Sequence, residues 1–259
     1  MSLGPKWWCR LAVPVSMLLL SGGLAAPARA GGPNAASPRG GKPMQLRQAA
    51  SPRGGKPMQL RQTVVDTARG HGDVVSFTFD DGPNPADTLR LLDVLRRRHV
   101  RAVFCLIGDQ VRGHPEVVRR IVAGGHVLCN HSLHHDDLSA LTPEQIRADL
   151  AETSALIRRA VPHAPIPYFR APFGSWGQSP QVAAALGMQP LGWRLAITDW
   201  EPPGTDVLVQ RLRDGITPGA VVLMHDGGGD RSQTVAAVDR IIPELRAQGW
   251  RFTLPRRRG

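Results

Sequence analysis

From about residue 71 onward, short apolar runs alternate with segments in which apolar residues recur every three or four positions. Short apolar runs bounded by turn residues are typical of buried strands, and the longer spacing is typical of helices. The expected strands cover residues 74–79, 102–107, 127–129, 168–169, 191–195, 220–224 and 251–254. The expected helices cover residues 86–98, 115–123, 143–160, 181–186, 207–214 and 235–248.

This alternation of strands and helices defines the fold class. Strands that are apolar throughout, rather than at every second residue, indicate a parallel sheet covered by helices, so the chain is of the α/β class. About 185 residues are too few for a full eight-unit barrel. We therefore predict a distorted (β/α) barrel with about seven parallel strands, whose reactive side chains lie at the carboxyl ends of the strands.

The first 30 residues have the pattern of an export signal. Lys6 and Arg10 precede an apolar run at residues 11–20, and a short A-R-A sequence ends at Ala30. A positive start, a short apolar core and an A-x-A site are typical of a secretory signal peptide, and the run is short for a membrane-spanning helix. An uncleaved anchor is the alternative. We predict a signal peptide at residues 1–30 and a secreted or cell-wall-associated protein without a stable membrane span.

A repeated segment follows the predicted signal. Residues 35–48 and 49–62 have the same sequence, AASPRGGKPMQLRQ, which is rich in Gly, Pro and Arg and has no apolar period. Two copies are too few to build a solenoid, whereas this composition is typical of a flexible linker. We predict a basic, low-complexity linker over residues 31–70 and one folded domain over residues 71–259.

The formal net charge of +11 is concentrated at the two ends of the chain. Residues 1–62 contain nine Lys or Arg and no acidic residue, and three arginines occupy positions 256–258. Residues 63–255 contain the other 20 Lys or Arg against all 21 acidic residues. A nearly neutral domain does not indicate a nucleic-acid-binding surface, so we expect no nucleic-acid partner. The basic ends could associate electrostatically with an anionic cell wall, and we expect a monomer.

Two cysteines remain if the predicted signal, which contains Cys9, is removed. They are Cys105 and Cys129, on two neighbouring expected strands. An even pair in an oxidising compartment favours a disulfide. Two separate buried thiols are the alternative, and the sequence leaves both open.

Charged and polar side chains gather where four of the expected strands end. They are Asp80 and Asp81 after the first strand, His131 and His135 after the third, Arg170 after the fourth and His225 after the sixth. Each group alone has an ordinary interpretation, because carboxylates cap turns and histidines occur in loops without metal. Their shared placement at strand ends instead indicates one reactive site.

The residue types at this site indicate metal-assisted hydrolysis of an acyl bond. One carboxylate and two imidazoles can supply the three protein ligands of a catalytic Zn²⁺, which lowers the pKa of bound water and polarises a carbonyl. A neighbouring carboxylate can accept a proton, a separate histidine can donate one, and an arginine can hold the base ionised and oriented. Nucleophilic-serine chemistry has less support, because the sequence has no G-x-S-x-G motif.

In this order, the residues resemble the motifs of the polysaccharide deacetylase family, also called the NodB-homology carbohydrate esterases, over about residues 74–254. The family motifs are T-F-D-D, H-[ST]-x-x-H, R-x-P-[YF], D-x-x-D-W and L-x-H. They correspond to residues 78–81, 131–135, 170–173, 196–200 and 223–225. The resemblance implies a distorted (β/α) barrel and substrates that are N- or O-acetylated sugars of chitin, peptidoglycan or xylan.

The resemblance also implies a bound metal ion. Asp81, His131 and His135 would be its ligands, and His134 would be a neighbour of the ligands and not a ligand. Zn²⁺ is the expected ion, with Co²⁺ or another divalent ion as the alternative.

Catalytic roles follow from the same resemblance. Asp80 would be the general base, Arg170 would orient it, and His225 would be the general acid. The residues implied to bind the substrate are Phe173, whose backbone N–H would bind the oxyanion, and Trp200 and Leu223, which would line the pocket for the acetyl methyl group.

One position departs from the family pattern. The first Asp of D-x-x-D-W is Ala196 here, and the resemblance implies that this Asp supports the active-site histidine and arginine. Its replacement removes no ligand, base or acid, but it affects how the pKa of His225 is set. Asp199 or Asp226 could take over the role.

We therefore predict an exported, metal-dependent hydrolase that removes acetyl groups from an N-acetylated polysaccharide or oligosaccharide. The first alternative is an O-acetyl esterase with the same mechanism, acting for example on xylan. The second is a weakly active carbohydrate-binding protein.

Overall fold

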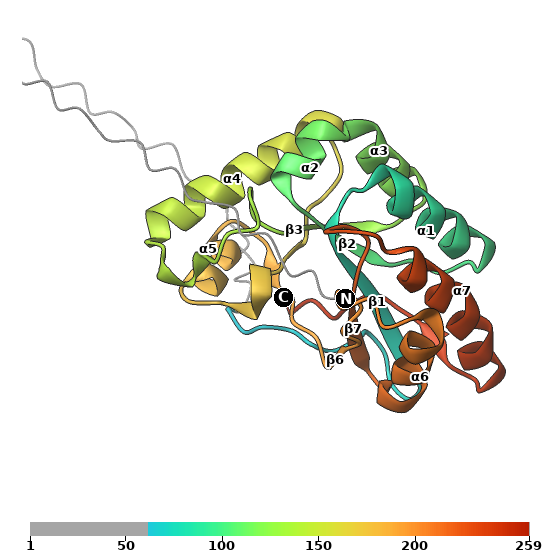
Figure 1. Cartoon of the computed structure of the whole chain (residues 1–259). Coiled ribbons are helices and arrows are strands. Elements are labelled where there is room, and N and C mark those ends of the chain that lie inside the picture. The colour runs from blue at the N-terminus through green and yellow to red at the C-terminus, as the bar shows by residue number, and fades with distance from the viewer. Residues whose placement is uncertain (1–61, 259) are drawn as a thin grey trace, which may run out of the picture. The chain divides into compact units, whose positions relative to one another are not determined.

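The computed structural model describes residues 62–258, so the predicted signal peptide and nearly all of the duplicated segment lie outside the described residues. A curled parallel sheet forms the centre of the described part, with the strand order β5-β4-β3-β2-β1-β7-β6 and β8 paired with β1 (Figure 1). The strands are β1 Val74–Gly82, β2 Val103–Leu106, β3 Val127–Asn130, β4 Tyr168–Phe169, β5 Gln189–Pro190, β6 Leu195–Ala196, β7 Ala220–His225 and β8 Arg251–Phe252. The prediction of a distorted barrel with about seven parallel strands is confirmed.

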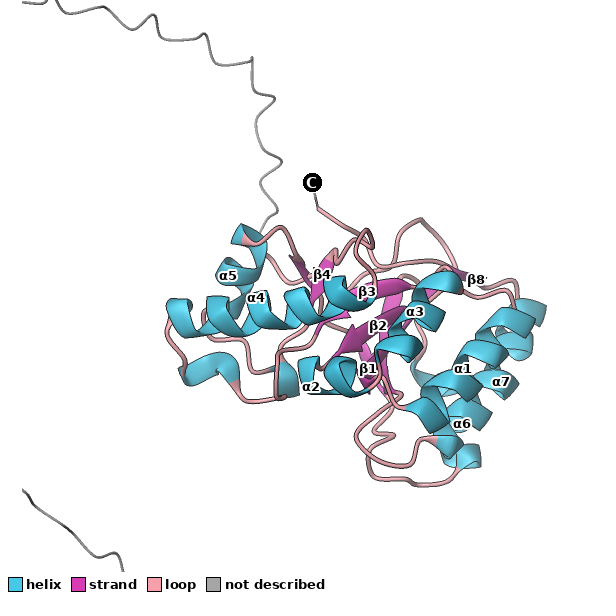
Figure 2. Cartoon of the chain, turned by 90° about the horizontal axis from the view of Figure 1, so that it is seen from above, coloured by secondary structure: helices cyan, strands magenta, loops and turns pink. Residues whose placement is uncertain are grey.

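Seven α-helices among the described residues lie around the outside of this sheet (Figure 2). They are α1 Pro85–Arg97, α2 Gly108–Gly113, α3 Pro115–Ala123, α4 Pro143–Ala160, α5 Ser179–Ala185, α6 Thr205–Gly215 and α7 Ser232–Ala247. Two 3₁₀ helices, η1 Leu138–Ala140 and η2 Pro172–Gly174, lie in loops. Each helix contacts the next one in the series α6, α7, α1, α3, α4 and α5, so the helices follow the curve of the sheet.

Successive side chains of β1 point alternately to the apolar core under the helices and to the interior of the barrel. Val75, Phe77 and Phe79 belong to the large apolar cluster that the helices share. Thr78 and Asp80 point the other way, where both contact the side chain of Arg170. Because side chains alternate along a strand, one segment both packs the core and delivers polar groups to the interior.

The helix that was expected to begin after Thr142 does so with a capping box. The hydroxyl of Thr142 accepts from the backbone N–H of Gln145, and the Gln145 side chain accepts from the N–H of Thr142. Pro143 occupies the first helical position, where its missing N–H costs nothing. The six-residue helix α2 was not expected, because it is too short to show an apolar period.

The single strand expected over residues 191–195 is wrong. The structure has two separate two-residue strands there, β5 and β6, and residues 191–194 bend between them. The backbone in this bend pairs with other parts of the chain: the N–H of Gly192 donates to Val65, and the N–H of Arg194 donates to Val221. These tertiary hydrogen bonds replace a continuous ladder, and the apolar pattern does not reveal them.

Residues 63–68, which we call the N-terminal segment, pack on the barrel although the sequence placed them in the linker. The N–H of Val65 donates to Pro190 beside β5, and the N–H of Ala68 donates to Gly219 beside β7. Val65 and Ala68 are buried. The N-terminal segment therefore joins the two sides of the curled sheet on which β5 and β7 lie.

Cys105 on β2 and Cys129 on β3 are paired in register and form a disulfide bond in the structure. Both are fully buried in a second apolar cluster with Tyr168, Leu191 and Val221. The sequence left open a disulfide or two thiols, and the structure has the disulfide. Within residues 62–258, no helix has the length and apolar character that crossing a membrane requires.

The packing of the N-terminal segment predicts that Val65→Ala destabilises the protein. Val65 is 1% exposed, so truncating its side chain should lower the free energy of unfolding by about 2 kcal/mol. Val207→Ala is the matched control, because Val207 is 41% exposed on α6 and should change stability little. Urea unfolding of both variants measures the difference. Equal stability of the two variants would contradict the packing described here.

Candidate active site

The carboxyl ends of the strands enclose a cavity of about 520 Å³. Its walls come from β1 and β7 and from the loops that follow β3, β4, β5, β6 and β7. The residues singled out by the motifs that line it are Asp80, Asp81, His131, His135, Phe173, Trp200, Leu223 and His225. The structure thus brings together residues that are up to 145 positions apart in the sequence.

Two adjacent carboxylates at the end of β1 face this one cavity. Neighbouring residues of a regular strand point to opposite sides, so the strand must be irregular here. Asp81 has a positive φ of 72°, and the pairing of β1 with β2 shifts register between Asp80 and Gly82. The loop after β7 passes so close that a Cβ at Gly227 would overlap the carbonyl of Asp81.

The chain curls after β3 and brings two imidazoles together. Ser132 and His135 both have positive φ, and the Ser132 hydroxyl accepts from the N–H of His135 at 3.0 Å. His131 Nδ1 lies 2.8 Å from the carbonyl oxygen of Arg170. This hydrogen bond leaves His131 Nε2 for the cavity, 3.4 Å from Asp81 Oδ1, and His135 Nε2 lies 3.3 Å from the same oxygen.

Asp81, His131 and His135 fit a divalent cation. One ligand atom from each lies within 4.8 Å of the others. The buried Oδ1 of Asp81 has no hydrogen-bond partner among the described residues. A carboxylate with two imidazoles is a donor set typical of Zn²⁺, and the His131–Arg170 hydrogen bond is the kind that orients a metal-binding imidazole. His134 is turned away, with Nδ1 2.6 Å from Asp109 at the surface.

The pKa values of Asp81, His131 and His135 depend on one another. Burial raises the pKa of Asp81, but contact with His131 and the nearby imidazole charges outweigh it and lower the pKa to about 2. Burial opposes protonation of His131, but the carboxylates of Asp80 and Asp81 outweigh it and raise its pKa. Burial, and then the charge of His131, lower the pKa of His135. An ionised carboxylate and a neutral imidazole are the forms that bind a metal, so the shifts of Asp81 and His135 favour cation binding, whereas His131 would give up a proton to a bound cation.

Arg170 is fully buried and holds Asp80 in place. Its Nη1 donates to Asp80 Oδ1 at 2.7 Å and to the Thr78 hydroxyl at 2.9 Å. Its Nε and Nη2 donate to the carbonyl oxygens of Leu191 and Gly192. With one oxygen of Asp80 on the guanidinium, the other lies 3.6 Å from His131 Nε2 and faces the candidate cation site.

His225 at the end of β7 is paired with Asp199. Its Nδ1 lies 2.7 Å from Asp199 Oδ1, and its backbone N–H donates to Asp199 Oδ2 at 2.8 Å. The Thr234 hydroxyl donates to the same oxygen. Burial lowers the pKa of His225, but the hydrogen bond and charge of Asp199, together with the charges of Asp80 and Asp81, raise it overall.

Asp199, three residues after Ala196 in the same D-x-x-D-W segment, therefore makes the contact with the histidine that was expected of the missing carboxylate. Ala196 itself is on β6, in register with Leu223. The carboxylate of Asp226 instead accepts a hydrogen bond from the Thr88 hydroxyl. Burial raises the pKa of Asp226 to about 7. Asp226 thus links β7 to α1.

Two exposed aromatic rings stand on the walls of the cavity. Phe173 is 71% exposed, and its ring centroid lies 4.5 Å from that of His135. Trp200 is 45% exposed, and its ring lies 5.4 Å from that of His225. Leu223, by contrast, is buried. The cavity therefore has an apolar lining beside its charged groups, as sites for small polar ligands commonly do.

Arg231 is a residue of the site that the motifs did not indicate. It lines the cavity and is 95% buried, with a relative exposure of 5%. Its guanidinium donates to the carbonyl oxygens of Gly227, Gly228 and Asp199. It thereby ties the loop after β7 to the loop that carries Asp199. The only sequence signal is its place after three consecutive glycines.

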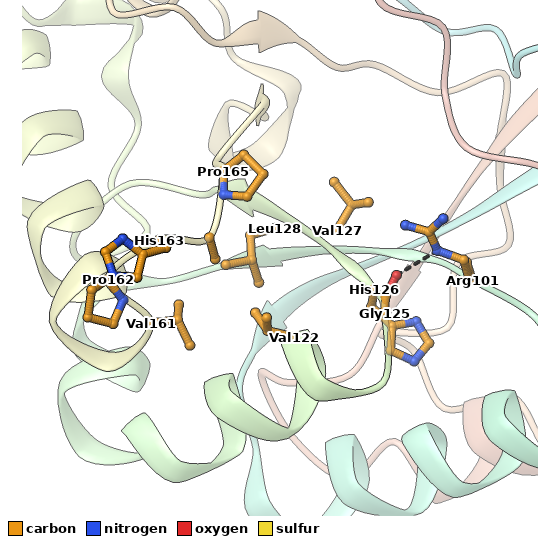
Figure 3. Close-up of a pocket in the computed structure, with 11 residues that line it drawn as sticks. Arg101, Val122, Gly125, His126, Val127, Leu128, Val161, Pro162, His163 and Pro165 are labelled. Atoms are coloured by element: carbon orange, nitrogen blue, oxygen red, sulfur yellow. Dashed lines mark hydrogen bonds between the residues drawn. The ribbon is translucent and has the colours of Figure 1, made fainter.

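A second cavity of about 520 Å³ lies near the start of β3 (Figure 3). Arg101 donates to the carbonyl oxygen of Gly125 there, and His126 accepts from the backbone N–H of Ala102. Burial, and then the charge of Arg101, lower the pKa of His126 to about 4. No carboxylate lines this cavity, and His126, one of its two histidines, accepts a hydrogen bond from the backbone, so we assign the chemistry to the first cavity.

Comparison with known proteins agrees with this geometry. A family model described as polysaccharide deacetylase matches residues 67–191. A chitooligosaccharide deacetylase of Bradyrhizobium sp. (strain ANU 289) is 40% identical over an alignment of 199 residues that covers 70% of this chain and 91% of that protein. The chain belongs to the polysaccharide deacetylase family.

Two solved structures extend the comparison. The peptidoglycan N-acetylglucosamine deacetylase Bc1960 is 30% identical, with a TM-score of 0.68 over 74% of this chain and 89% of that chain. BA3943 of Bacillus anthracis, described as a pseudoenzyme, is 29% identical, with a TM-score of 0.69 over 74% of this chain and 67% of that chain. Because a relative of this similarity is a pseudoenzyme, the activity has to be argued from the site.

The ligand geometry predicts that His131→Ala and His135→Ala each lower the affinity for Zn²⁺. Each removes one of three ligand atoms, whereas His134→Ala is the matched control because His134 faces Asp109 at the surface. Isothermal titration of the full-length protein with Zn²⁺ measures the affinities. We expect wild-type affinity in the control only. Equal affinity in all three variants would show that the cation binds elsewhere.

The hydrogen bonds of Asp199 predict how the pKa of His225 responds to mutation. Asp199 favours the protonated imidazole, so Asp199→Asn should lower the pKa of His225. Ala196→Asp should leave it unchanged, because the role of the missing carboxylate is already filled. NMR titration of the His225 ring protons measures both. A rise in the pKa with Ala196→Asp alone would mean that Asp199 does not fill the role.

Proposed function

We propose that this protein is an exported hydrolase that removes acetyl groups from an N-acetylated oligosaccharide or polysaccharide of the chitin or peptidoglycan type. One observation carries the proposal: a cation-binding triad, the Arg170-bound carboxylate of Asp80 and the His225–Asp199 pair line or adjoin one cavity. The relatives named above, a chitooligosaccharide deacetylase and a peptidoglycan N-acetylglucosamine deacetylase, support the substrate class.

Asp81, His131 and His135 would hold the divalent cation, with Zn²⁺ as the best match to their donor atoms. When bound, such an ion lowers the pKa of a water molecule and polarises a carbonyl group. Asp80 accepts a proton from the attacking water, because its oxygen that is not bound by Arg170 faces the triad.

His225 donates a proton to the leaving nitrogen. A donor must be protonated at the working pH, and the charge and hydrogen bond of Asp199 favour that form. The backbone N–H of Phe173 stabilises the oxyanion, and its positive φ of 58° is consistent with a backbone shaped for a ligand. Trp200 and Leu223 hold the acetyl methyl group against an apolar wall.

We propose that the reaction takes place outside the cytoplasm. The signal-like sequence at residues 1–30 supports export. The disulfide between Cys105 and Cys129 supports an oxidising compartment, because such bonds are rare in reducing ones. The basic linker and the C-terminal arginines would add electrostatic adhesion to an anionic cell wall.

Acetate release tests the proposed function. The full chain is assayed on chitooligosaccharides, peptidoglycan and acetylxylan, first as purified, then after chelation, and again after Zn²⁺ or Co²⁺ is restored. We expect release from an N-acetylated substrate that chelation abolishes and metal restores. Release from acetylxylan alone would identify an O-acetyl esterase. Binding of oligosaccharide without any release would identify a carbohydrate-binding protein and overturn the proposal.

The acid and base roles predict the effect of Asp80→Asn. The amide cannot accept a proton, so kcat/KM should fall by about 10²–10⁴-fold while Zn²⁺ affinity stays within a few fold of wild type. The wild-type profile of kcat/KM against pH should be bell-shaped, because one group must be deprotonated and another protonated. Asp93→Asn on the exposed face of α1 is the control. Full activity in Asp80→Asn would exclude Asp80 as the base.

A further inference from the structure

A smaller cavity of about 350 Å³ adjoins the active-site cavity. Phe173, Gly174 and Trp193 line both cavities, so these three residues form a shared boundary. The boundary is tightly packed, because a Cβ at Gly174 would lie 2.8 Å from the Trp193 ring. The other residues of the smaller cavity are Val64, Asp66, Trp176 and Gly192.

One wall of this cavity is built by the N-terminal segment. The carbonyl of Val65 accepts from the N–H of Gly192, and the carbonyl of Asp66 accepts from the N–H of Val221, so the backbone is fixed on both sides. Val64 packs directly against Gly192. Val64 and Asp66 lie just ahead of residues 67–191, which match the family model.

The side chains suit a sugar ring. Phe173 offers a largely exposed aromatic face, and Trp193 and Trp176 add aromatic surface. Aromatic faces pack on the apolar faces of sugars, and a few polar groups then fix the orientation. Asp66 is such a group: its side chain is 48% exposed, and its ion pair with Arg194 is long, at 3.5 Å. Its carboxylate can therefore accept hydrogen bonds from hydroxyl groups.

We propose that this cavity, which we call the N-terminal subsite, binds the sugar unit next to the one that loses its acetyl group. This inference rests on the proposed function, because a chain-like substrate must leave the active-site cavity beside the reacting unit. Phe173, Gly174 and Trp193 line both cavities, so the two cavities are adjacent, and the next unit of a chain that passes over the exposed ring of Phe173 would lie in the N-terminal subsite. Asp66 then makes the protein select oligomers over the monomer.

Asp66→Ala in the full chain tests the N-terminal subsite. The kcat/KM for acetate release is compared on N-acetylglucosamine and on its dimer to pentamer. We expect the variant to lose about tenfold on the oligomers, as for a hydrogen bond to a charged group, through a higher KM with unchanged kcat. Activity on the monomer should be unchanged. Asp93→Ala is the matched control, an exposed Asp with a similarly long ion pair of 3.6 Å to Arg96.

A second measurement separates this inference from the proposed function. Oligomer affinity is followed by tryptophan fluorescence, which needs no turnover and reports on Trp176 and Trp193 at the subsite together with Trp200 in the active-site cavity. If the wild type releases no acetate, the proposed function fails, but weaker oligomer binding in Asp66→Ala than in Asp93→Ala would still support the subsite. An equal loss on monomer and oligomers, or no loss in either measurement, would overturn it. If Asp66→Ala does not fold, the same measurements are made on Asp66→Asn, which keeps the shape of the side chain.

Discussion

The active site depends on one buried charge, the guanidinium of Arg170. A charge without contact with water is costly unless it is paired and hydrogen-bonded. Here Asp80 supplies the opposite charge, and the Thr78 hydroxyl and the carbonyl oxygens of Leu191 and Gly192 accept the remaining hydrogen bonds. The same contacts fix the carboxylate proposed as the base, so the stability of the barrel interior and the geometry of the reaction share one set of hydrogen bonds.

The backbone of Arg170 extends this constraint to the cation site. Its N–H donates to Asn130 at the end of β3, and its carbonyl oxygen lies 2.8 Å from His131 Nδ1. A single residue therefore orients the proposed base through its side chain and a candidate metal ligand through its main chain. The N-terminal segment adds to this arrangement, because Val65 holds Gly192, whose carbonyl oxygen Arg170 binds. Val65, in the N-terminal segment, is thus connected to Arg170 through two hydrogen bonds.

The site residues at strand ends could be predicted because apolar runs reveal where parallel strands stop, and polar residues such as His225 directly follow. Not all of their partners could be predicted. The family pattern assigned the support of His225 to position 196, where this chain has Ala, and left Asp199 and Asp226 as alternatives; only the folded loop shows that Asp199 reaches the imidazole. Arg231 acts on backbone carbonyls, which leave no mark in a sequence. The N-terminal segment has too few apolar residues to show a period, and its packing depends on distant strands.

We propose that Arg170 acts on the reaction through Asp80. A double-mutant cycle of Arg170→Lys and Asp80→Asn, with kcat/KM for acetate release measured for all four proteins, tests it most directly. Lysine keeps the charge but cannot reach all four acceptors. We predict that Arg170→Lys lowers kcat/KM at least tenfold in the wild-type background and has little further effect in Asp80→Asn. Losses that multiply in the double variant would show that the two residues act independently, and would contradict the account.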